Sequence, residues 1–187
     1  MILLIGKSAA GKDKTRNELV KMGYIPVVTY TTRPLRVKDG EVDGVTYNFI
    51  SKEDFLKKES EGFFAETTSY NVATGETWYY GSAISDLTSD KVMIANPDGV
   101  KKLKKLTTIN PVVFNILASE ETIWNRLRQR GDDNAEARRR LNADDIDFAD
   151  INDYVDFSIR SDIGLSAKEI ALLIDDIYRK VDSLNEE

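Results

Sequence analysis

The chain has 187 residues, a net charge of −6, and 41% hydrophobic and 31% charged residues, a composition typical of a globular protein with one α/β domain. It contains no cysteine and no histidine, which excludes disulfides, thiolate nucleophiles, histidine general bases and metal sites built from either residue. The acidic balance argues against a general nucleic-acid-binding surface, and no apolar run approaches the roughly 18 residues of a membrane span. We therefore expect a cytoplasmic protein without nucleic-acid or membrane partners, and the sequence predicts no particular oligomeric state.

The first predicted elements surround a glycine-rich loop. Residues 1–5 form an apolar run that predicts a buried strand, and residues 12–22 read as a helix that Gly23 ends. Between them lies a Gly-x-x-x-x-Gly-Lys pattern, which is the layout of a phosphate-binding P-loop. Glycines allow the backbone to approach a ligand, the loop amides attract phosphate oxygens, and the lysine would reach the terminal phosphates. The predicted nucleotide-binding residues are Gly6, Lys7, Ser8, Ala9, Ala10, Gly11, Lys12 and Asp13.

One position departs from the P-loop pattern. The residue after the lysine is normally a serine or threonine whose hydroxyl contacts Mg²⁺, whereas this chain has Asp13. A carboxylate can hold a hard cation directly or through water. Asp13 is therefore the candidate metal ligand.

Residues 29–82 differ in composition from the flanking sequence, and we expect them to form an inserted lobe. They are rich in Thr, Tyr, Gly and charged residues, with a strand-like piece at 45–50 and a helix predicted over 52–61 after Ser51. Arg33 and Arg36 place two guanidiniums near Pro34, and arginine forks bind phosphate bidentately. A solvated basic loop is the alternative interpretation.

Strands and helices alternate in the rest of the chain. Strands are predicted over 24–28, 91–95, 111–117 and 154–159, and helices over 98–106, 120–130, 136–149 and from 167 onward. A capping box at Ser166 and Glu169 begins the last helix, whose predicted apolar stripe is Ile170, Leu173, Ile174, Ile177 and Val181. This alternation predicts an α/β fold, a three-layer parallel sheet with its site at the carboxyl ends of the strands.

Arginines on both sides of the polar segment 131–134 predict a mobile lid. Arg126, Arg128 and Arg130 precede the segment, and Arg138, Arg139 and Arg140 follow it. A charged helix face paired with neighbouring acids is the alternative, which we favour for Arg128, Arg138 and Arg139.

Two further motifs carry a resemblance to a known family. Thr31-Thr32-Arg33 through Arg36, followed by Gly-Glu-Val-Asp-Gly-Val-Thr-Tyr-Asn-Phe at 40–49, resembles the guanylate kinase signature, and Tyr79-Tyr80-Gly81-Ser82 resembles a second motif of that family. With the P-loop, the similarity runs from Met1 to about Leu141. It implies a P-loop kinase core of residues 1–28 and 83–187, a nucleoside-monophosphate-binding lobe of residues 29–82, and a lid at about 130–145.

The resemblance also implies residue roles. Arg33, Arg36, Tyr47 and Tyr80 would hold the phosphate of a nucleoside monophosphate, and Glu66 would face the guanine edge beside Thr29, Ser82 and Asn96. A carboxylate accepts hydrogen bonds from guanine N1–H and N2–H₂, and adenine offers no matching pair of donors. The lid arginines Arg130, Arg140 and Arg126 would join Lys12 on the transferring phosphoryl group. Among Tyr47, Trp78, Tyr79 and Tyr80, we expect at least two to be ordinary lobe core.

The implied reaction is phosphoryl transfer from ATP, with Mg²⁺, to GMP or dGMP. Ile94 and Asn96 stand where the family has aspartates, and Arg160 stands where an asparagine is expected at the adenine pocket, so the base preference is left open. The alternatives are a non-catalytic guanylate-kinase-like binding module and a kinase for another acceptor, such as a different nucleoside monophosphate or a ribose bisphosphate. Lys12 and the lid arginines favour an enzyme, while Glu66 and Tyr47 favour a base in the acceptor pocket.

Overall fold

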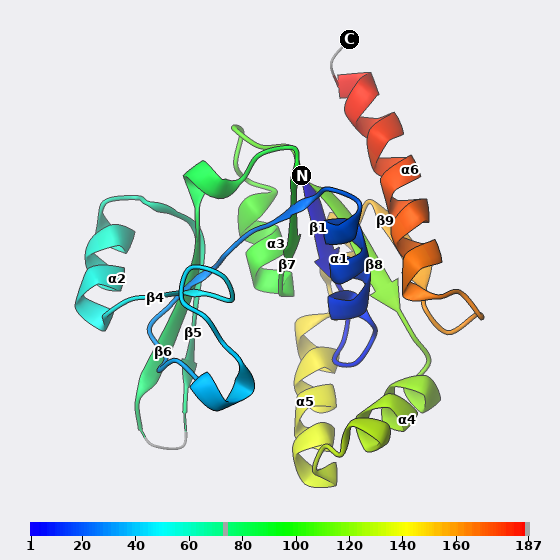
Figure 1. The fold of residues 1–187 in the computed structure, drawn as a ribbon, viewed down its shortest axis with the longest axis horizontal. Helices are drawn as coiled ribbons and strands as arrows, with labels where there is room; N and C mark the ends of the chain where they lie inside the picture. The colour runs from blue at the N-terminus through cyan, green and yellow to red at the C-terminus, as the bar shows by residue number, and fades with distance from the viewer. Residues whose placement is uncertain (73–74, 186–187) are drawn as a thin grey trace.

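A five-stranded sheet forms the centre of the computed structural model, which describes residues 1–72 and 75–185 (Figure 1). The strand order is β2-β7-β1-β8-β9, and all four neighbouring pairs are parallel. The predicted three-layer parallel α/β fold is therefore confirmed. The strands are β1 (Ile2–Ile5), β2 (Ile25–Pro26), β7 (Lys91–Ile94), β8 (Val112–Leu117) and β9 (Phe157–Arg160).

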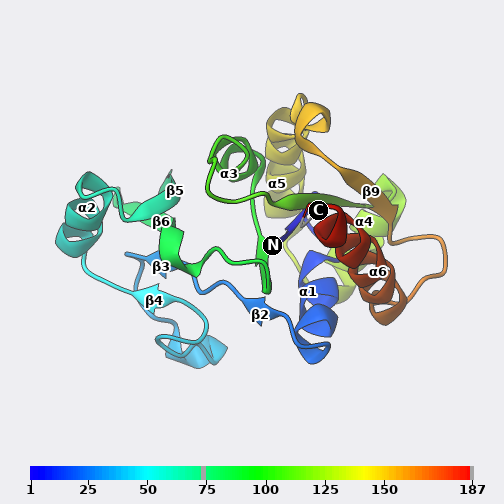
Figure 2. The ribbon, with the colours of Figure 1, turned by 90° about the horizontal axis from the view of Figure 1, so that it is seen from above.

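Alternating side chains of β1 build a core on each face of this sheet. Ile2 and Leu4 pack with residues of α1 (Lys12–Lys21) and α6 (Ala167–Asn185). Leu3 and Ile5 point the opposite way and pack with residues of α3 (Pro97–Leu103). Figure 2 shows α1 and α6 on one side of the sheet and α3 on the other. Because both faces are covered, the strands are continuously apolar, as is usual for parallel sheets.

The last helix turns a slightly different face to the sheet than its sequence pattern predicts. Ile170 and Ile174 are buried, but Leu173 is 40% exposed, so its place in the predicted stripe is wrong. Tyr178 is buried instead, and its hydroxyl accepts a hydrogen bond of 2.7 Å from the N-terminal ammonium of Met1. The helix is rotated about its axis relative to the predicted orientation, but the residues that face the sheet still follow the helical period. The capping box is confirmed, since Ser166 and Glu169 exchange hydrogen bonds.

A second sheet lies to one side of the core, in the order β4-β3-β6-β5 (Figure 1, left). Its strands are β3 (Tyr30–Thr31), β4 (Asn48–Phe49), β5 (Phe64–Asn71) and β6 (Thr77–Ala83). Helix α2 (Lys52–Ser60) begins at Ser51, which accepts the Asp54 amide, and its Phe55 stacks on Phe64 at 4.5 Å. The strand β4 is shorter than predicted because residues 43–47 close a turn, with the Gly44 amide bonded to the Tyr47 carbonyl.

Two helices form a separate pair beyond the carboxyl end of β1, at the bottom of Figure 1. These are α4 (Glu120–Arg130) and α5 (Asn134–Asp147), and Gly131 ends the first with a φ of +80°. Three short 3₁₀ turns complete the described elements: η1 (Val37–Asp39), η2 (Ile84–Asp86) and η3 (Ile151–Tyr154). None of the helices described is both long and apolar enough to cross a membrane. The cytoplasmic location stays a prediction.

Candidate active site

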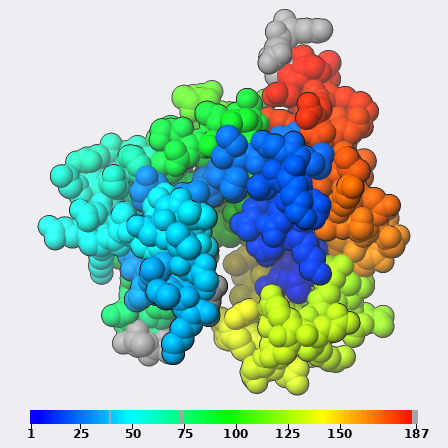
Figure 3. Space-filling model, in the orientation of Figure 1, coloured from blue at the N-terminus to red at the C-terminus, as the bar shows by residue number. Residues whose placement is uncertain are grey.

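A cleft of about 570 Å³ lies where the P-loop, the second sheet and α5 meet. Figure 3 shows the hollow between the lobe that contains the second sheet, coloured blue to green, and α5, coloured yellow. The P-loop follows β1, so the cleft opens at the carboxyl ends of the central strands, where α/β sheets bind ligands. Its lining includes these predicted site residues: Gly6, Ser8, Lys12, Thr29, Tyr47, Glu66, Tyr80, Asn96 and Arg140.

The P-loop curls tightly around the end of Lys12. Gly6 has a φ of +147°, and a Cβ atom there would stand 2.4 Å from the Ile116 carbonyl oxygen, so no larger residue fits. The Lys12 ammonium donates hydrogen bonds to the carbonyl oxygens of Gly6 (2.6 Å) and Lys7 (3.1 Å). Burial lowers the pKa of Lys12, while the carboxylates of Asp13 and Asp144 oppose that shift. The loop thus holds a cation at its centre.

Arg126 supports the loop from outside the cleft. Its guanidinium donates to the carbonyl oxygens of Ala9 (3.1 Å) and Ala10 (2.9 Å) and to the hydroxyl and carbonyl of Ser161. These four bonds tie the P-loop on one side to the end of β9 on the other. Its side chain is therefore engaged with backbone rather than pointing at the cleft.

Glu66 forms the floor of the cleft at the second sheet. It is 8% exposed, and its Oε1 accepts a hydrogen bond of 2.8 Å from Ser82. Burial raises the pKa of Glu66 above its ordinary value. Gly99 passes close by, because a Cβ there would lie 3.5 Å from Glu66 Oε2 and 3.0 Å from Asn96 Oδ1. Asn96 caps α3 and donates to the Tyr70 hydroxyl at 3.2 Å.

The side chain of Arg33 is buried in the lobe and is not part of the cleft lining. It makes a two-pronged ion pair with Glu41, with 5% and 11% of the two side chains exposed, and it lies 4.9 Å from the Tyr47 ring centre. This pairing lowers the pKa of Glu41 to about 2. Arg36 is exposed and lies 5.8 Å from the Trp78 ring centre. Glu41 was not predicted as a site residue. It lies in a turn with other acidic residues, and nothing in the local sequence distinguishes it from them.

Aromatic side chains of the lobe divide into two groups. Tyr47 and Tyr80 line the cleft, with ring centres 6.1 Å apart. Tyr79 packs on Phe55 in the lobe interior, and Trp78 has a buried indole N–H without a partner among the described residues. Trp78 and Tyr79 are both only partly buried, so core packing for at least two of these four aromatics stays a prediction.

The lid arginines are held by acids of their own helix pair. Arg130 pairs with Asp132, and Arg140 pairs with Glu136 at 2.9 Å. Arg139 also pairs with Glu136, and it lines the cleft although the sequence analysis favoured an ordinary surface role for it. These bonds lower the pKa of Glu136 to about 2. Arg140 lines the cleft in the present arrangement, whereas Arg130 is not part of its lining.

Two aspartates of α5 contact the P-loop directly. Asp144 accepts a hydrogen bond of 2.6 Å from the Ser8 amide, and Asp145 pairs with Lys7. The sequence analysis named neither as a site residue. One sequence signal could have indicated Asp144 as a site residue. It lies four residues after the predicted site residue Arg140, and hence on the same face of the helix.

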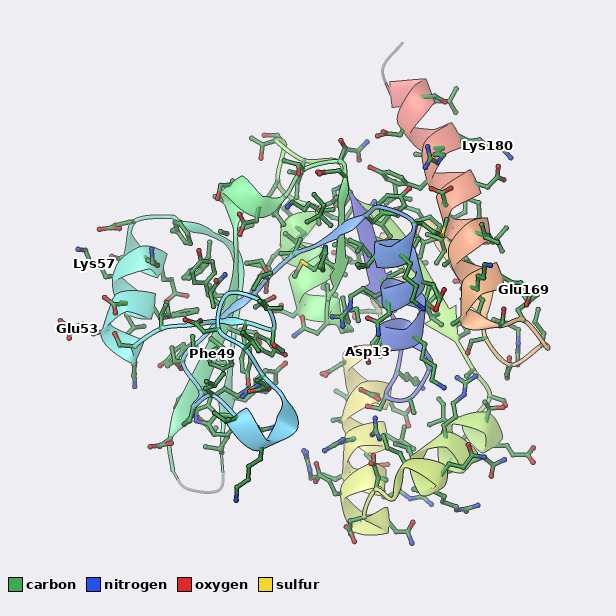
Figure 4. All side chains as sticks on the ribbon, viewed as in Figure 1. Asp13, Phe49, Glu53, Lys57, Glu169 and Lys180 are labelled. Atoms are coloured by element: carbon green, nitrogen blue, oxygen red, sulfur yellow. The ribbon has the colours of Figure 1, made fainter. Side chains whose placement is uncertain are left out.

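Asp13 stands at the beginning of α1 (Figure 4). Its side chain is 79% exposed, and it pairs with Arg16 at 3.8 Å. Among the described residues, no group of three or more acidic ligands is positioned to hold a metal ion. Mg²⁺ is usually held by one or two carboxylates together with substrate phosphates, and a single carboxylate such as Asp13 could take that part.

A P-loop that shares one cleft with a second sheet and an arginine-bearing helix defines a P-loop nucleoside monophosphate kinase. The family model described as guanylate kinase matches residues 1–163, and the chain therefore belongs to the guanylate kinase family.

Known relatives agree with this assignment over most of their length. The chain is 29% identical to a guanylate kinase of Clostridioides difficile over 97% of this chain and 89% of the relative. It is 32% identical to a guanylate kinase of Syntrophus aciditrophicus over 83% of this chain and 77% of the relative. A crystal structure of guanylate kinase from Anaplasma phagocytophilum shares the fold, with a TM-score of 0.68 at 21% identity, covering 96% of this chain and 84% of that one.

Proposed function

We propose that this protein transfers the γ-phosphoryl group of ATP to a guanine nucleoside monophosphate, GMP or dGMP. One observation carries the proposal: a single cleft is lined by the P-loop lysine Lys12, the buried carboxylate of Glu66 and the arginine Arg140. Phosphoryl transfer needs in-line positioning and neutralised charge more than it needs covalent chemistry from the protein. The absence of histidine and cysteine is therefore compatible with the reaction.

The donor triphosphate binds the P-loop, from Gly6 to Asp13. Loop amides and the positive end of α1 attract its oxygens, and Lys12 exchanges its two carbonyl partners for the terminal phosphates. Mg²⁺ bound with the nucleotide would neutralise charge on the phosphates, and we expect Asp13 to help hold it. Arg126 keeps the loop in shape through its bonds to Ala9 and Ala10.

The acceptor lies in the lobe of residues 29–82. Glu66 accepts hydrogen bonds from guanine N1–H and N2–H₂, with Thr29, Ser82 and Asn96 around the base. The phosphate end lies near Tyr47 and Tyr80, with Arg36 as the mobile cation. Because Arg33 is already paired with Glu41, its role is to hold the loop of residues 33–41 in place beside Tyr47.

The helix pair α4–α5 closes over the reacting phosphates as the lid. Arg140 lines the cleft already, and Arg130 joins it when its pair with Asp132 is exchanged for phosphate. Such closure excludes water, which would otherwise hydrolyse ATP. Arg140 leaves Glu136, whose side chain is 39% exposed, and exposed ion pairs contribute only about 0–1 kcal/mol, so this exchange costs little. Arg130 leaves Asp132, which is 18% exposed, and phosphate replaces the carboxylate as its charged partner.

The test is ADP release from ATP and Mg²⁺ with a panel of acceptors: GMP, dGMP, AMP and ribose 1,5-bisphosphate. We expect GMP or dGMP to support turnover at least about a thousandfold better than AMP, because a site that pairs buried polar groups with a base rejects analogues strongly. Nucleotide binding without turnover would contradict the proposal and indicate a binding module. Turnover with ribose bisphosphate alone would place the protein among kinases of another acceptor.

A further inference from the structure

The anion-binding end of the P-loop already has an anion on it. Ser8 of the P-loop lines the cleft, and its amide donates a hydrogen bond of 2.6 Å to Asp144 Oδ2. The neighbouring Lys7 pairs with Asp145 of the same helix. Charge-assisted hydrogen bonds of this length are about twice as strong as neutral ones. A carboxylate of this chain therefore stands where the proposed function needs a phosphate oxygen.

The placement of Asp144 is costly to its own helix. The last turn of α5 holds Asp144, Asp145 and Asp147 and has no basic residue. Acidic side chains at a helix carboxyl end face the negative pole of the helix dipole, which disfavours them. Their favourable partners lie across the cleft: the Ser8 amide, Lys7, and Lys12, whose pKa the Asp144 carboxylate raises against the effect of burial. The acids are thus stabilised by the P-loop rather than by α5.

We propose that Asp144 is an internal competitor for the donor site: its carboxylate occupies the P-loop in the free protein, and the donor triphosphate must displace it. The inference rests on the proposed function, because it assumes that the P-loop binds the triphosphate. Displacement frees α5 from the P-loop at the moment when ATP arrives. The lid is consequently released by the donor, and its arginines can then move onto the phosphates.

The experiment measures the binding of metal-free ATP, in EDTA, to the full-length protein by calorimetry. Asp144→Asn removes the competing charge with almost no change in shape. It should not destabilise α5, because it removes a negative charge from the negative end of the helix dipole. We expect Asp144→Asn to bind ATP about tenfold more tightly than the unmodified protein, as removal of a charge-assisted competitor predicts. The matched control is Asp147→Asn, which removes the same charge from the lining of the same cleft three residues along α5. Its effect should be about twofold or less, because screening weakens a charge that does not touch the ligand.

A second readout does not depend on ATP. The Ser8 amide should exchange its proton with solvent about tenfold faster in Asp144→Asn than in the unmodified protein, as measured by NMR, and at an unchanged rate in Asp147→Asn. Equal or weaker ATP binding by Asp144→Asn overturns the inference, and so does an unchanged rate of Ser8 exchange.

Lys12→Ala separates the inference from the proposed function. If Lys12→Ala weakens ATP binding and Asp144→Asn does not strengthen it, the P-loop site stands and the internal competitor is refuted. If neither substitution changes ATP binding, ATP does not occupy the P-loop, and both proposals fall.

Discussion

At the scale of single residues, the proposed function gives Glu66 the choice of acceptor. Its carboxylate is nearly buried and has one protein hydrogen bond, from Ser82. A buried acceptor that is left partly unpaired costs about 1–3 kcal/mol, more for a charged group. A base that brings two donors to this carboxylate satisfies it, whereas adenine leaves it unsatisfied.

Glu66→Gln should therefore lower the preference for GMP over AMP by about a hundredfold or more, because an amide oxygen accepts one donor where the carboxylate accepts two. The measurement is the ratio of kcat/KM for the two acceptors. Glu61→Gln is a suitable control, since Glu61 is an exposed residue of the same lobe. An unchanged ratio in Glu66→Gln would mean that the base is read elsewhere.

Glu66 also predicts a dependence of stability on pH. Burial raises its pKa, so between the ordinary pKa near 4.5 and the raised value the native protein binds more protons than the unfolded chain. The stability of the unmodified protein relative to Glu66→Gln is thus greatest below that ordinary pKa, and it falls as the pH rises through the raised pKa. Glu66→Gln should become more stable relative to the unmodified protein as the pH rises from the ordinary pKa of a glutamate through the raised pKa, measured by thermal unfolding. A stability difference that is flat over this range would contradict the raised pKa.

Residue roles could be predicted from the sequence only where they depend on local pattern. The P-loop positions follow from spacing, and Glu66 and Tyr47 follow from family motifs. The Arg33–Glu41 pair and the contact of Asp144 with Ser8 join segments whose approach the sequence does not state. Such contacts depend on tertiary geometry, which no local pattern encodes.

At the scale of elements, the turn from β1 into α1 depends on Gly6. An added Cβ would meet the Ile116 carbonyl at 2.4 Å, and the φ of +147° is itself unfavourable for other residues. Gly6→Ala should therefore lower the free energy of unfolding by about 3 kcal/mol or more. The control is Gly23→Ala, where φ is +106° but nothing lies within 4 Å of the added atom. For Gly23→Ala we expect the free energy of unfolding to fall by about 1 kcal/mol. Urea unfolding measures both, and similar losses would show that the Ile116 contact is relieved.

Helix α4 is joined to the P-loop by Arg126. Arg126→Lys keeps the charge but loses the fork that reaches both Ala9 and Ser161. We expect a loss of about 2 kcal/mol in the free energy of unfolding and a higher KM for ATP, with the KM for the acceptor nearly unchanged. Arg128→Lys, on the exposed side of α4, should change neither quantity. A fall in kcat without a change in stability or in the KM for ATP would instead assign Arg126 to the transferring phosphoryl group.

Element positions were predictable where caps and periods are strong, as at Ser51, Ser119 and Ser166. Strand lengths were less so. The strand β2 has two residues instead of the five predicted, because only Ile25 and Pro26 pair with β7 before the chain leaves the sheet for the lobe. The stripe on α6 was displaced at Leu173 because packing against α1 and β1 decides the rotation of that helix.

At the scale of the whole molecule, the fold places two binding surfaces on opposite walls of one cleft. The P-loop extends from the central sheet, Glu66 extends from the second sheet, and the lid helix α5 lies between them. The alternation of strands and helices was enough to predict the central sheet. The cleft between the central sheet and the lobe could be predicted only from the family resemblance, because no local sequence pattern determines how two sheets are oriented.

The most direct test of this account is the binding of a bisubstrate molecule, adenosine and guanosine joined by five phosphates, measured by calorimetry. The account predicts one site per chain and an affinity at least about a hundredfold above that of ATP alone, because joined ligands bind as one when both sites are spanned. Both Lys12→Ala and Glu66→Gln should weaken this binding. An affinity no greater than that of ATP, or binding that is insensitive to Glu66→Gln, would contradict a shared cleft for donor and acceptor.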